Sequence, residues 1–455
     1  MQFFIWTRNT ILIKLNLIKM KLIVFIILFI FNTNLIFATE ILTYLESAYK
    51  NNPILNAERE NYKAIKENIN ISRSEFLPSV SISGIQSSQQ DSNRANQAGV
   101  SLPDKSNTST TQSVSIDQKI FQGFQGYNSI KKSQLESKKA ALKLKDIEQI
   151  ILLQSANVYY DLVYKIKNTK FNLANIDLFE RQVEIDSSRV QKGEITLTDL
   201  AQSESSLAGA NAKFITAETE LLTAKSNFER TIRLPAPKEA AKESSIKKIS
   251  LNFPTSLSEA LNFSEKKNPK LLLAKLDYEI SEKNVNIEQS RFSPSASVSY
   301  TQSQSKDFSS SIDDIDKESL KATVTIPLFK GGKNYSLLKK SKFKKEQSNL
   351  LLQDTINEVK TDTTNSWSSY QSSESVLKAT LAQVKAAEIA NEGITLEYDS
   401  GNARTTLEVI QSRSLLLNAR ISNAIAERNF ATSKFKLLAV IGELTLENLK
   451  KSHLN

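Results

Sequence analysis

The sequence predicts a mainly α-helical chain with a small β part, in which one structural unit occurs twice. Two observations predict this fold class. The halves align without a gap for nearly thirty residues from Asn52-Pro53 and Asn268-Pro269 onward. In each half a short period-two pattern is followed by a very long helical stretch without proline. Strand and helix patterns thus recur in the same order, so the chain holds two copies of half a protein.

Identical residues mark matching positions of the two halves. The pairs before the strands are Tyr62 with Tyr278, Asn68 with Asn284 and Phe76 with Phe292. After a slip of eight residues the register resumes through Phe121 with Phe329, Tyr127 with Tyr335, Asn157 with Asn365 and Gly193 with Gly401. We therefore expect a first repeat over 39–233, a proline-containing linker over 234–256, a second repeat over 257–443 and a C-terminal tail over 444–455.

The N-terminus has the layout of a secretory signal peptide. Lys21 precedes the apolar core of residues 22–31, and a short region ends at Ala38. This order predicts a signal peptide over 1–38 with cleavage after Ala38. Met20 is an alternative initiator, in which case residues 1–19 would not belong to the translated protein. The alternative to a signal peptide is a membrane anchor, although the apolar core is shorter than a spanning helix needs.

Composition excludes most enzyme chemistry. The chain has no cysteine, and its one histidine is His453 near the end. Disulfides, thiol chemistry, histidine metal sites and histidine acid–base catalysis are therefore not expected, and we predict no metal, no cofactor and no enzyme activity. The net charge of +10 comes mostly from lysines spread along expected helices. We interpret these lysines as solvated helix faces, not as a nucleic-acid surface.

Each repeat is expected to begin with two helices. A short helix is predicted over 41–50 and again over 257–265, where Ser256 and Glu259 have capping-box spacing. A second helix begins at Asn52-Pro53 and at Asn268-Pro269, because asparagine caps free N–H groups and proline suits the first helical position. These second helices are expected to end near Glu75 and Arg291.

A strand pair follows in each repeat. Pro78 and Pro294 are expected to mark the change from helix to strand, since strict alternation begins directly after them over 79–83 and 295–300. Polar loops are predicted over 89–111 and 303–319. Alternation then returns at Val114, Ile116, Ala322, Val324, Ile326 and Leu328. The strand pairs are therefore predicted over 79–121 and 295–329.

These strands suit a membrane barrel or a half-buried soluble sheet. Small polar residues alternate with apolar residues, and no long apolar run follows residue 40. A chain that enters a membrane without such runs does so as strands. Four strands cannot close a transmembrane barrel, of which the smallest have about eight strands, so several copies would be needed.

Long helical hairpins complete each repeat. Gly123 and Gly331 are expected to allow the tight turn from strand to helix. A continuous helix over 127–191 would be roughly 100 Å long at 1.5 Å per residue. The chain should therefore turn near Gly193, and near Gly401 in the second repeat, and return as an antiparallel helix. The sparse apolar stripe is typical of coiled-coil packing, and a plain soluble coiled coil is an alternative.

Taken together, these features resemble the outer-membrane factor family, the TolC-like efflux and type I secretion proteins. The resemblance rests on the Asn-Pro helices, the Pro-Ser strands, the Phe-x-Gly turns and the hairpins, and it covers about residues 40–443. It implies a homotrimer in which each copy gives four strands to a twelve-stranded transmembrane β-barrel. The helical hairpins would form a trimeric α-barrel that crosses the periplasm and closes at its far end.

The resemblance places a periplasmic gate at the two hairpin ends. Residues 193–200 resemble the family's stretch and imply Thr198 and Asp199 as gate hydrogen-bond partners. Tyr398 matches the tyrosine before the second turn, and Arg404 matches the gate arginine if one residue is inserted. We expect Tyr398 and Arg404 to bond Asp199 in the closed state. The alternative is that these residues are ordinary solvated helix ends.

The same alignment suggests how ions would be selected. With the inserted residue, Glu408 and Gln411 fall at two positions that are acidic and face the lumen in the family. A ring of Glu408 carboxylates would favour cations in a narrow mouth, and the uncharged Gln411 would weaken that field.

The resemblance implies a passive exit duct in the outer membrane of a Gram-negative bacterium, surrounded by outer-membrane lipid and extending into the periplasm. Its partners would be a periplasmic adaptor (membrane fusion) protein and an inner-membrane transporter, with no nucleic acid. The run Asn51-Asn52-Pro53 slightly favours type I protein secretion over drug efflux. The rival hypothesis is a secreted periplasmic coiled-coil adaptor or spacer without a pore, although such proteins lack two strand–loop–strand units.

Overall fold

The computed structural model describes residues 40–237, 253–309, 312–400 and 404–451. The expected signal peptide, most of the linker and the turn at Gly401 lie outside these residues. The chain divides into two compact units. Unit 1 comprises Met1–Leu55, Glu148–Ser264 and Asp362–Asn455, and unit 2 comprises Asn56–Ile147 and Glu265–Thr361.

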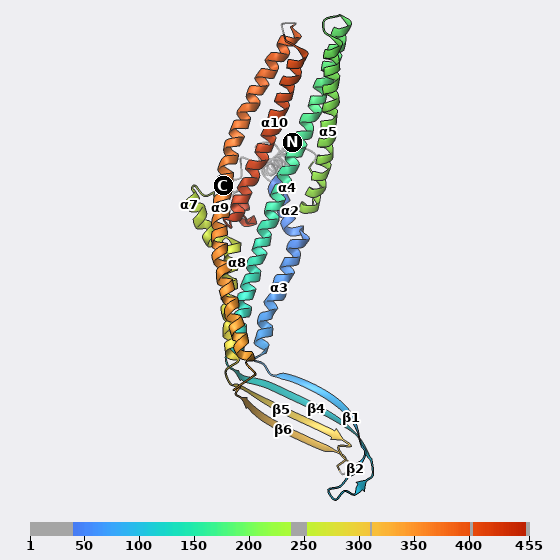
Figure 1. Cartoon of the computed structure of the whole chain (residues 1–455), viewed down its shortest axis with the longest axis vertical. Coiled ribbons are helices and arrows are strands. Elements are labelled where there is room, and N and C mark those ends of the chain that lie inside the picture. Colours follow the sequence, from blue (N-terminus) through green and yellow to red (C-terminus); the bar gives the residue numbers. More distant parts are fainter. Residues whose placement is uncertain (1–39, 238–252, 310–311, 401–403, 452–455) are drawn as a thin grey trace, which may run out of the picture. The chain divides into compact units, whose positions relative to one another are not determined.

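The helices of the two repeats have nearly the same lengths (Figure 1). The long helices α4 (Gln125–Gln191) and α9 (Lys333–Asp399) each have 67 residues. Their returning partners are α5 (Leu197–Ile232) and α10 (Thr406–Val440). The helices before the strands are α2 (Glu40–Asn51), α3 (Pro53–Ser74), α7 (Leu257–Lys267) and α8 (Pro269–Ser290).

Capping explains where the second helices start. The Asn268 side chain accepts a hydrogen bond from the Leu271 N–H at 3.1 Å, and Pro269 occupies the first turn. The Asn52 side chain does the same for the Ile54 N–H at 2.9 Å. Side-chain acceptors of this kind satisfy N–H groups that have no partner inside the helix.

Unit 2 contains one four-stranded antiparallel sheet in the order β1-β4-β5-β6. Its strands are β1 (Ser79–Asp91), β4 (Lys105–Gln122), β5 (Ser295–Lys306) and β6 (Ile315–Thr325). The central pair, β4 and β5, joins the two repeats. A small hairpin of β2 (Arg94–Ala95) and β3 (Ser101–Leu102) lies between β1 and β4 in the sequence.

The predicted loops were too long, because the strands extend into them. Much of 89–111 is β1 or β4, and much of 303–319 is β5 or β6. Hydroxyl pairs across the strands compensate for the missing apolar contacts. The Oγ atoms of Ser83 and Ser113 lie 2.8 Å apart, and Thr111 Oγ1 lies 2.8 Å from Ser305 Oγ. Such cross-strand pairs stabilise a sheet where apolar alternation is absent.

β6 ends earlier than the alternation indicated. Ile326 and Leu328 were expected in the strand, but β6 stops at Thr325. Pro327 follows, and it has no N–H to donate and restricts the residue before it. The strand therefore cannot continue through this position.

The two faces of the sheet differ in chemistry. One row across the four strands is apolar and consists of Val80, Ile116, Tyr300 and Leu320. The adjacent row is small and polar and consists of Ser81, Ser115, Thr301 and Ser319. Neighbouring rows point to opposite faces, so at the level of these two rows one face is apolar and the other is polar.

The turns from strand to helix use left-handed backbone. Gly123 follows β4 with φ +58°, and Gly331 precedes α9 with φ +57°. Their surroundings differ. A Cβ atom at Gly123 would lie 2.3 Å from the Ser293 Cβ and 2.7 Å from the Ser290 carbonyl oxygen, whereas one at Gly331 would meet nothing within 4 Å. Pro78 and Pro294 lie directly before β1 and β5.

The main apolar core lies in unit 1. Tyr159 and Tyr160 of α4 are buried with Phe228 of α5 and Phe435 of α10. The segment expected as a C-terminal tail contributes to this core. Its helix α11 (Leu446–Lys451) carries the buried Leu449, and Leu444 just before it is also buried.

No helix among the described residues combines the length and the apolar character that crossing a membrane requires.

Candidate functional site

The two hairpin ends in unit 1 share one local design. Thr196 caps α5, and its Oγ1 accepts from the Asp199 N–H at 3.3 Å while the Asp199 carboxylate accepts from the Thr196 N–H at 3.0 Å. Thr405 and Glu408 make the same reciprocal pair at the start of α10, at 3.3 and 2.8 Å. Both are capping boxes, in which two free N–H groups are satisfied by side chains.

These caps lower the pKa of both carboxyl groups. For Asp199 the largest cause is the hydrogen bond from the Thr196 side chain, and for Glu408 it is the bond from the Thr405 N–H. Hydrogen bonds to a carboxylate favour its charged form. Both carboxylates are therefore committed to the turns of their own hairpins.

A buried carboxylate, Asp186, links the two hairpins close to these turns. Its side chain is fully buried on α4. Tyr398 Oη of α9 donates to one carboxylate oxygen at 2.6 Å, and Gln182 Nε2 donates to the same oxygen at 3.0 Å. Ser203 Oγ of α5 donates to the other oxygen at 2.5 Å. We call these four residues the Asp186 cluster.

A fourth helix joins the cluster through Tyr398. Thr406 Oγ1, in the first turn of α10, lies 3.0 Å from Tyr398 Oη. The cluster therefore connects α4 and α5 of the first repeat with α9 and α10 of the second. Buried polar groups contribute most when all of them are satisfied, and they are costly when one partner is removed.

Two arginines surround the cluster. The Arg189 guanidinium lies 4.3 Å from the centre of the Tyr398 ring, and its Nη2 donates to the Tyr398 carbonyl at 3.1 Å. Arg413 of α10 is buried and donates to the Leu178 carbonyl at 2.9 Å. Burial raises the pKa of Tyr398, and its bond to Asp186 raises it further, so the phenol stays protonated as a donor.

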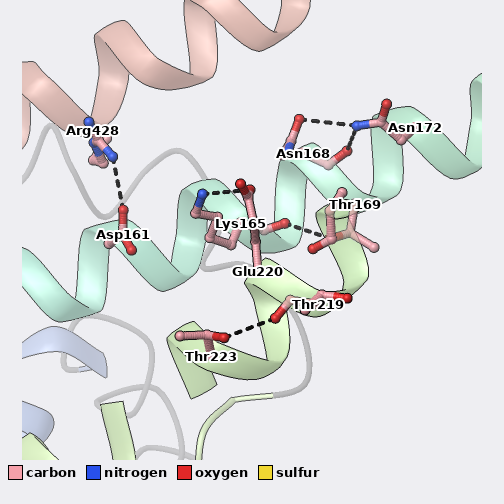
Figure 2. A network of polar contacts seen from close by, with 10 residues as sticks. Asp161, Lys165, Asn168, Thr169, Asn172, Thr219, Glu220, Thr223 and Arg428 are labelled. Atoms are coloured by element: carbon pink, nitrogen blue, oxygen red, sulfur yellow. Dashed lines mark hydrogen bonds and ion pairs between the residues drawn. The ribbon is translucent and has the colours of Figure 1, made fainter. Parts of the chain in front are cut away.

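A second polar network connects the same hairpins nearer the N-terminus of α4 than the Asp186 cluster (Figure 2). Asp161 of α4 pairs with Arg428 of α10 at 2.9 Å, and Lys165 of α4 pairs with Glu220 of α5 at 2.7 Å. Thr169 Oγ1 also donates to the Ala217 carbonyl of α5. These ion pairs are partly exposed, so each is expected to contribute little to stability. They fix the register of α4 against both returning helices.

The described residues hold no group of three or more histidine, cysteine or acidic side chains that could bind a metal ion.

Comparison with known proteins identifies the family. A sequence profile described as "Outer membrane efflux protein" matches residues 44–231 and 260–443, which is one match for each repeat. The chain belongs to this family. Its members are outer-membrane channels and not enzymes, so the protein is an exit duct in the outer membrane of a Gram-negative bacterium.

Individual relatives agree along most of the chain. The outer membrane efflux protein BepC of Brucella suis biovar 1 (strain 1330) is 25% identical over 411 residues, which cover 89% of this chain and 86% of BepC. The outer membrane protein TolC of Escherichia coli (strain K12) is 20% identical over 432 residues, 90% of this chain and 84% of TolC. The crystal structure of VceC from Vibrio cholerae has a TM-score of 0.75 at 17% identity, covering 89% of this chain and 96% of VceC.

The gate residues expected from the sequence lie near the hairpin ends but make other contacts. Among the described residues, no hydrogen bond or ion pair joins Tyr398 or Arg404 to Asp199. Arg404 instead donates to Glu397 at 2.6 Å and to Glu408 at 2.9 Å, which ties α9 to α10. The expected link to Asp199 remains a prediction for contacts between copies of the chain.

The other expected residues are distributed around the same turns. Thr198 and Gln411 are exposed, and Glu408 is half-buried. Sequence reasoning missed Asp186, because two of its three partners, Tyr398 and Ser203, lie on other helices. The one local signal was that Gln182, Asp186 and Arg189 recur at helical spacing on one face of α4.

Proposed function

We propose that three copies of the chain assemble into one gated exit duct of a tripartite transport system. The observation that carries this proposal is the sheet. Within the described part of the chain, β1 and β6 each pair with one strand only. They are 13 and 11 residues long, and such long free edges normally find a partner. Three sheets of four strands joined edge to edge would close a barrel and leave no edge.

The two faces of the sheet support this arrangement. The apolar row of Val80, Ile116, Tyr300 and Leu320 suits contact with lipid, and the row of serine and threonine suits a water-filled lumen. The long polar helices would extend the lumen into the periplasm. Cargo would pass without covalent chemistry.

The hairpin ends would be the gate. The Asp186 cluster and the Arg189–Tyr398 contact hold the two hairpins of one copy together in the present state. Thr198 and Arg404 are exposed at the hairpin ends, where contacts between copies would form. A few charge-assisted bonds of this kind are stable, yet a docking partner can outweigh them.

The expected partners are a periplasmic adaptor protein and an inner-membrane transporter, because the chain has no energy source of its own. Type I protein secretion is the proposed branch, and its test is whether deletion of the gene stops export of a protein substrate or raises drug sensitivity. Glu408 and Gln411 would set a weak cation preference at the mouth.

The direct test is single-channel conductance of the purified mature protein in a planar bilayer, beside Arg404→Ala. Arg404 ties the end of α9 to the start of α10, so its loss should loosen the gate and raise a small conductance several-fold. Arg428→Ala is the matched control, since Arg428 also pairs with a carboxylate but lies in mid-helix. Folded protein that never forms pores would favour the poreless adaptor.

A further inference from the structure

The apolar face of the sheet continues onto the first turn of α4. Phe121 of β4 pairs with Ala296 of β5, which is four residues from Tyr300, so Phe121 lies on the apolar face. The ring centres of Phe121 and Phe124 are 5.6 Å apart. Tyr127 follows three residues later, and Phe124 and Tyr127 are 67% and 55% exposed. An aromatic surface therefore connects the apolar face of the sheet with the start of the helix.

A lysine follows this aromatic position by four residues in both repeats. Tyr127 and Lys131 of α4 match Tyr335 and Lys339 of α9, and Tyr335 is 66% exposed. Residues four apart share a helix face, and the Lys131 Nζ lies 5.6 Å from the centre of the Tyr127 ring. Four residues rise about 6 Å along the axis. The headgroup layer on one side of a bilayer has about the same thickness, roughly 6 Å.

The same face carries one more lysine in each repeat. Lys138 follows Lys131 by seven residues, Lys342 follows Lys339 by three, and both Lys138 and Lys342 are exposed. Glu346 lies one turn beyond Lys342, which is farther from the strands, so the positive charge is concentrated next to the sheet. We call Lys131, Lys138, Lys339 and Lys342 the basic collar.

The basic collar differs from the lysines around it in having no acidic partner. Within the described part of the chain, none of the four collar lysines pairs with a carboxylate. Lysines on other faces of the same helices do have such partners, and these pairs are Lys132–Glu136, Lys139–Asp277 and Lys345–Glu282. The charge of the collar is therefore left for a partner outside the chain.

We propose that the basic collar binds the phosphate groups of anionic phospholipids in the periplasmic leaflet of the outer membrane. This inference rests on the proposed function only in that the strands enter the membrane. The helices begin where the strands end and extend into the periplasm, so the leaflet beside the collar is the periplasmic one. Lysine stems can lie along the aromatic surface while the ammonium groups stay among the phosphates.

Charge and position favour this occupant. Aromatic side chains are enriched where a membrane protein crosses the interface, and lysine clusters directly beside an inserted segment attract anionic lipids. The collar follows the order that such an interface requires, with the aromatic ring nearer the strands and the lysine one turn deeper in the periplasm. The attraction falls off within about 8 Å at physiological salt, so only a surface at this level can use it.

The test compares spin-labelled phosphatidylglycerol with spin-labelled phosphatidylcholine by electron spin resonance, using the mature protein reconstituted in phosphatidylcholine vesicles. Wild type should associate several-fold more strongly with phosphatidylglycerol at low salt. About 1 M salt should remove most of this preference, since the Debye length falls to about 3 Å. The variant Lys131→Gln/Lys138→Gln/Lys339→Gln/Lys342→Gln should bind both lipids almost equally, and replacement of the same four lysines by arginine should retain the preference.

The matched control removes the same charge from exposed positions of unit 1. Lys170→Gln/Lys192→Gln/Lys213→Gln/Lys385→Gln should keep the lipid preference of wild type. Equal losses in the two glutamine variants, or a wild type without any preference, would overturn the collar. Collar-dependent binding to purified peptidoglycan without a lipid preference would also overturn it, in favour of an acidic polymer.

Pore formation separates this inference from the proposed duct. Wild type and all three variants should form pores in bilayers of phosphatidylcholine alone, because the collar lies outside the gate. Pores combined with equal binding of the two lipids by wild type would overturn the collar and leave the duct intact. Folded wild type that forms no pore would overturn the duct.

Discussion

The helices α4 and α9 have the same length and the same place in their repeats, yet they occupy different environments. α4 contacts helices of both repeats and carries Leu152, Tyr159 and Leu162 into the core. α9 leaves large apolar residues such as Phe343 and Leu350 exposed. Duplication thus preserved the backbone, while the positions of α4 that match Phe343 and Leu350, namely Leu135 and Leu142, are partly covered. Equivalent positions in a duplicated chain therefore reveal which surfaces lack a partner.

The hairpin ends show the same divergence in polar groups. Asp186 of α4 aligns with Ile394 of α9, and Tyr398 of α9 aligns with Val190 of α4. The buried cluster consequently forms once per chain, with the acceptor Asp186 from the first repeat and the donor Tyr398 from the second. Both ends keep their capping boxes, which depend on local sequence only.

The largest effect should come from Asp186→Ala. This change removes the acceptor of three hydrogen bonds and leaves buried donors unsatisfied. The free energy of unfolding of the mature protein should therefore fall by about 4 kcal/mol. Denaturant unfolding followed by circular dichroism measures this. Asp177→Ala, an exposed position on the same helix, should stay within about 0.5 kcal/mol of wild type. Equal losses in the two variants would refute the role of the cluster.

The two glycine turns give the next largest contrast. Gly123→Ala combines a left-handed backbone with a Cβ atom placed against Ser293, so it should lower the free energy of unfolding by about 3 kcal/mol. Gly331→Ala meets open space and should cost only the backbone penalty of about 1 kcal/mol. Thermal unfolding of the paired variants compares them. A larger loss at Gly331 would show that the packing around Gly123 is not tight.

The capping boxes should respond equally in both repeats. Thr196→Ala and Thr405→Ala each remove one cap, and each should destabilise the protein by about 1 kcal/mol. Thr198→Ala, two residues away and exposed, serves as the control and should have almost no effect. A strong asymmetry between the two caps would mean that one of them also makes contacts between copies.

The smallest effect is the pH dependence of these caps. Hydrogen bonding lowers the pKa of Asp199 and Glu408 in the folded state. A carboxyl group with a lowered folded pKa contributes stability that is present above its unfolded pKa, about 4, and is lost as pH falls through the folded pKa. The stability difference between wild type and Thr196→Ala should therefore shrink between pH 7 and pH 3. A difference that grows on acidification would contradict this sign.

Local sequence signals predicted much of the fold. The Asn-Pro starts, the strand starts after Pro78 and Pro294, and the long helices are all set by neighbouring residues. The loop lengths were wrong because serine and threonine pairs extend the strands through contacts with other strands. The end of β6 was wrong because Pro327 was not weighed against the alternation. The first error concerns pairing across the sheet, which a single strand does not encode, whereas the second overlooked a residue in the strand's own sequence.

The candidate site was less predictable from the sequence. The resemblance led to Tyr398 and Arg404, which do lie at the hairpin ends, but it assigned Asp199 as their partner. Asp199 belongs to a cap that its own turn requires, whereas the acceptor for Tyr398 is Asp186 on α4. A buried acceptor contributed by the other repeat leaves little trace in local sequence.

Single-channel conductance of Asp186→Asn beside Asp199→Asn tests the central claim most directly. Asparagine keeps the size of each side chain and removes its charge. The account predicts a conductance several-fold above wild type for Asp186→Asn and one near wild type for Asp199→Asn. A pore that opens with Asp199→Asn and stays unchanged with Asp186→Asn would contradict it, and would favour the link from Tyr398 and Arg404 to Asp199 that the family resemblance suggested.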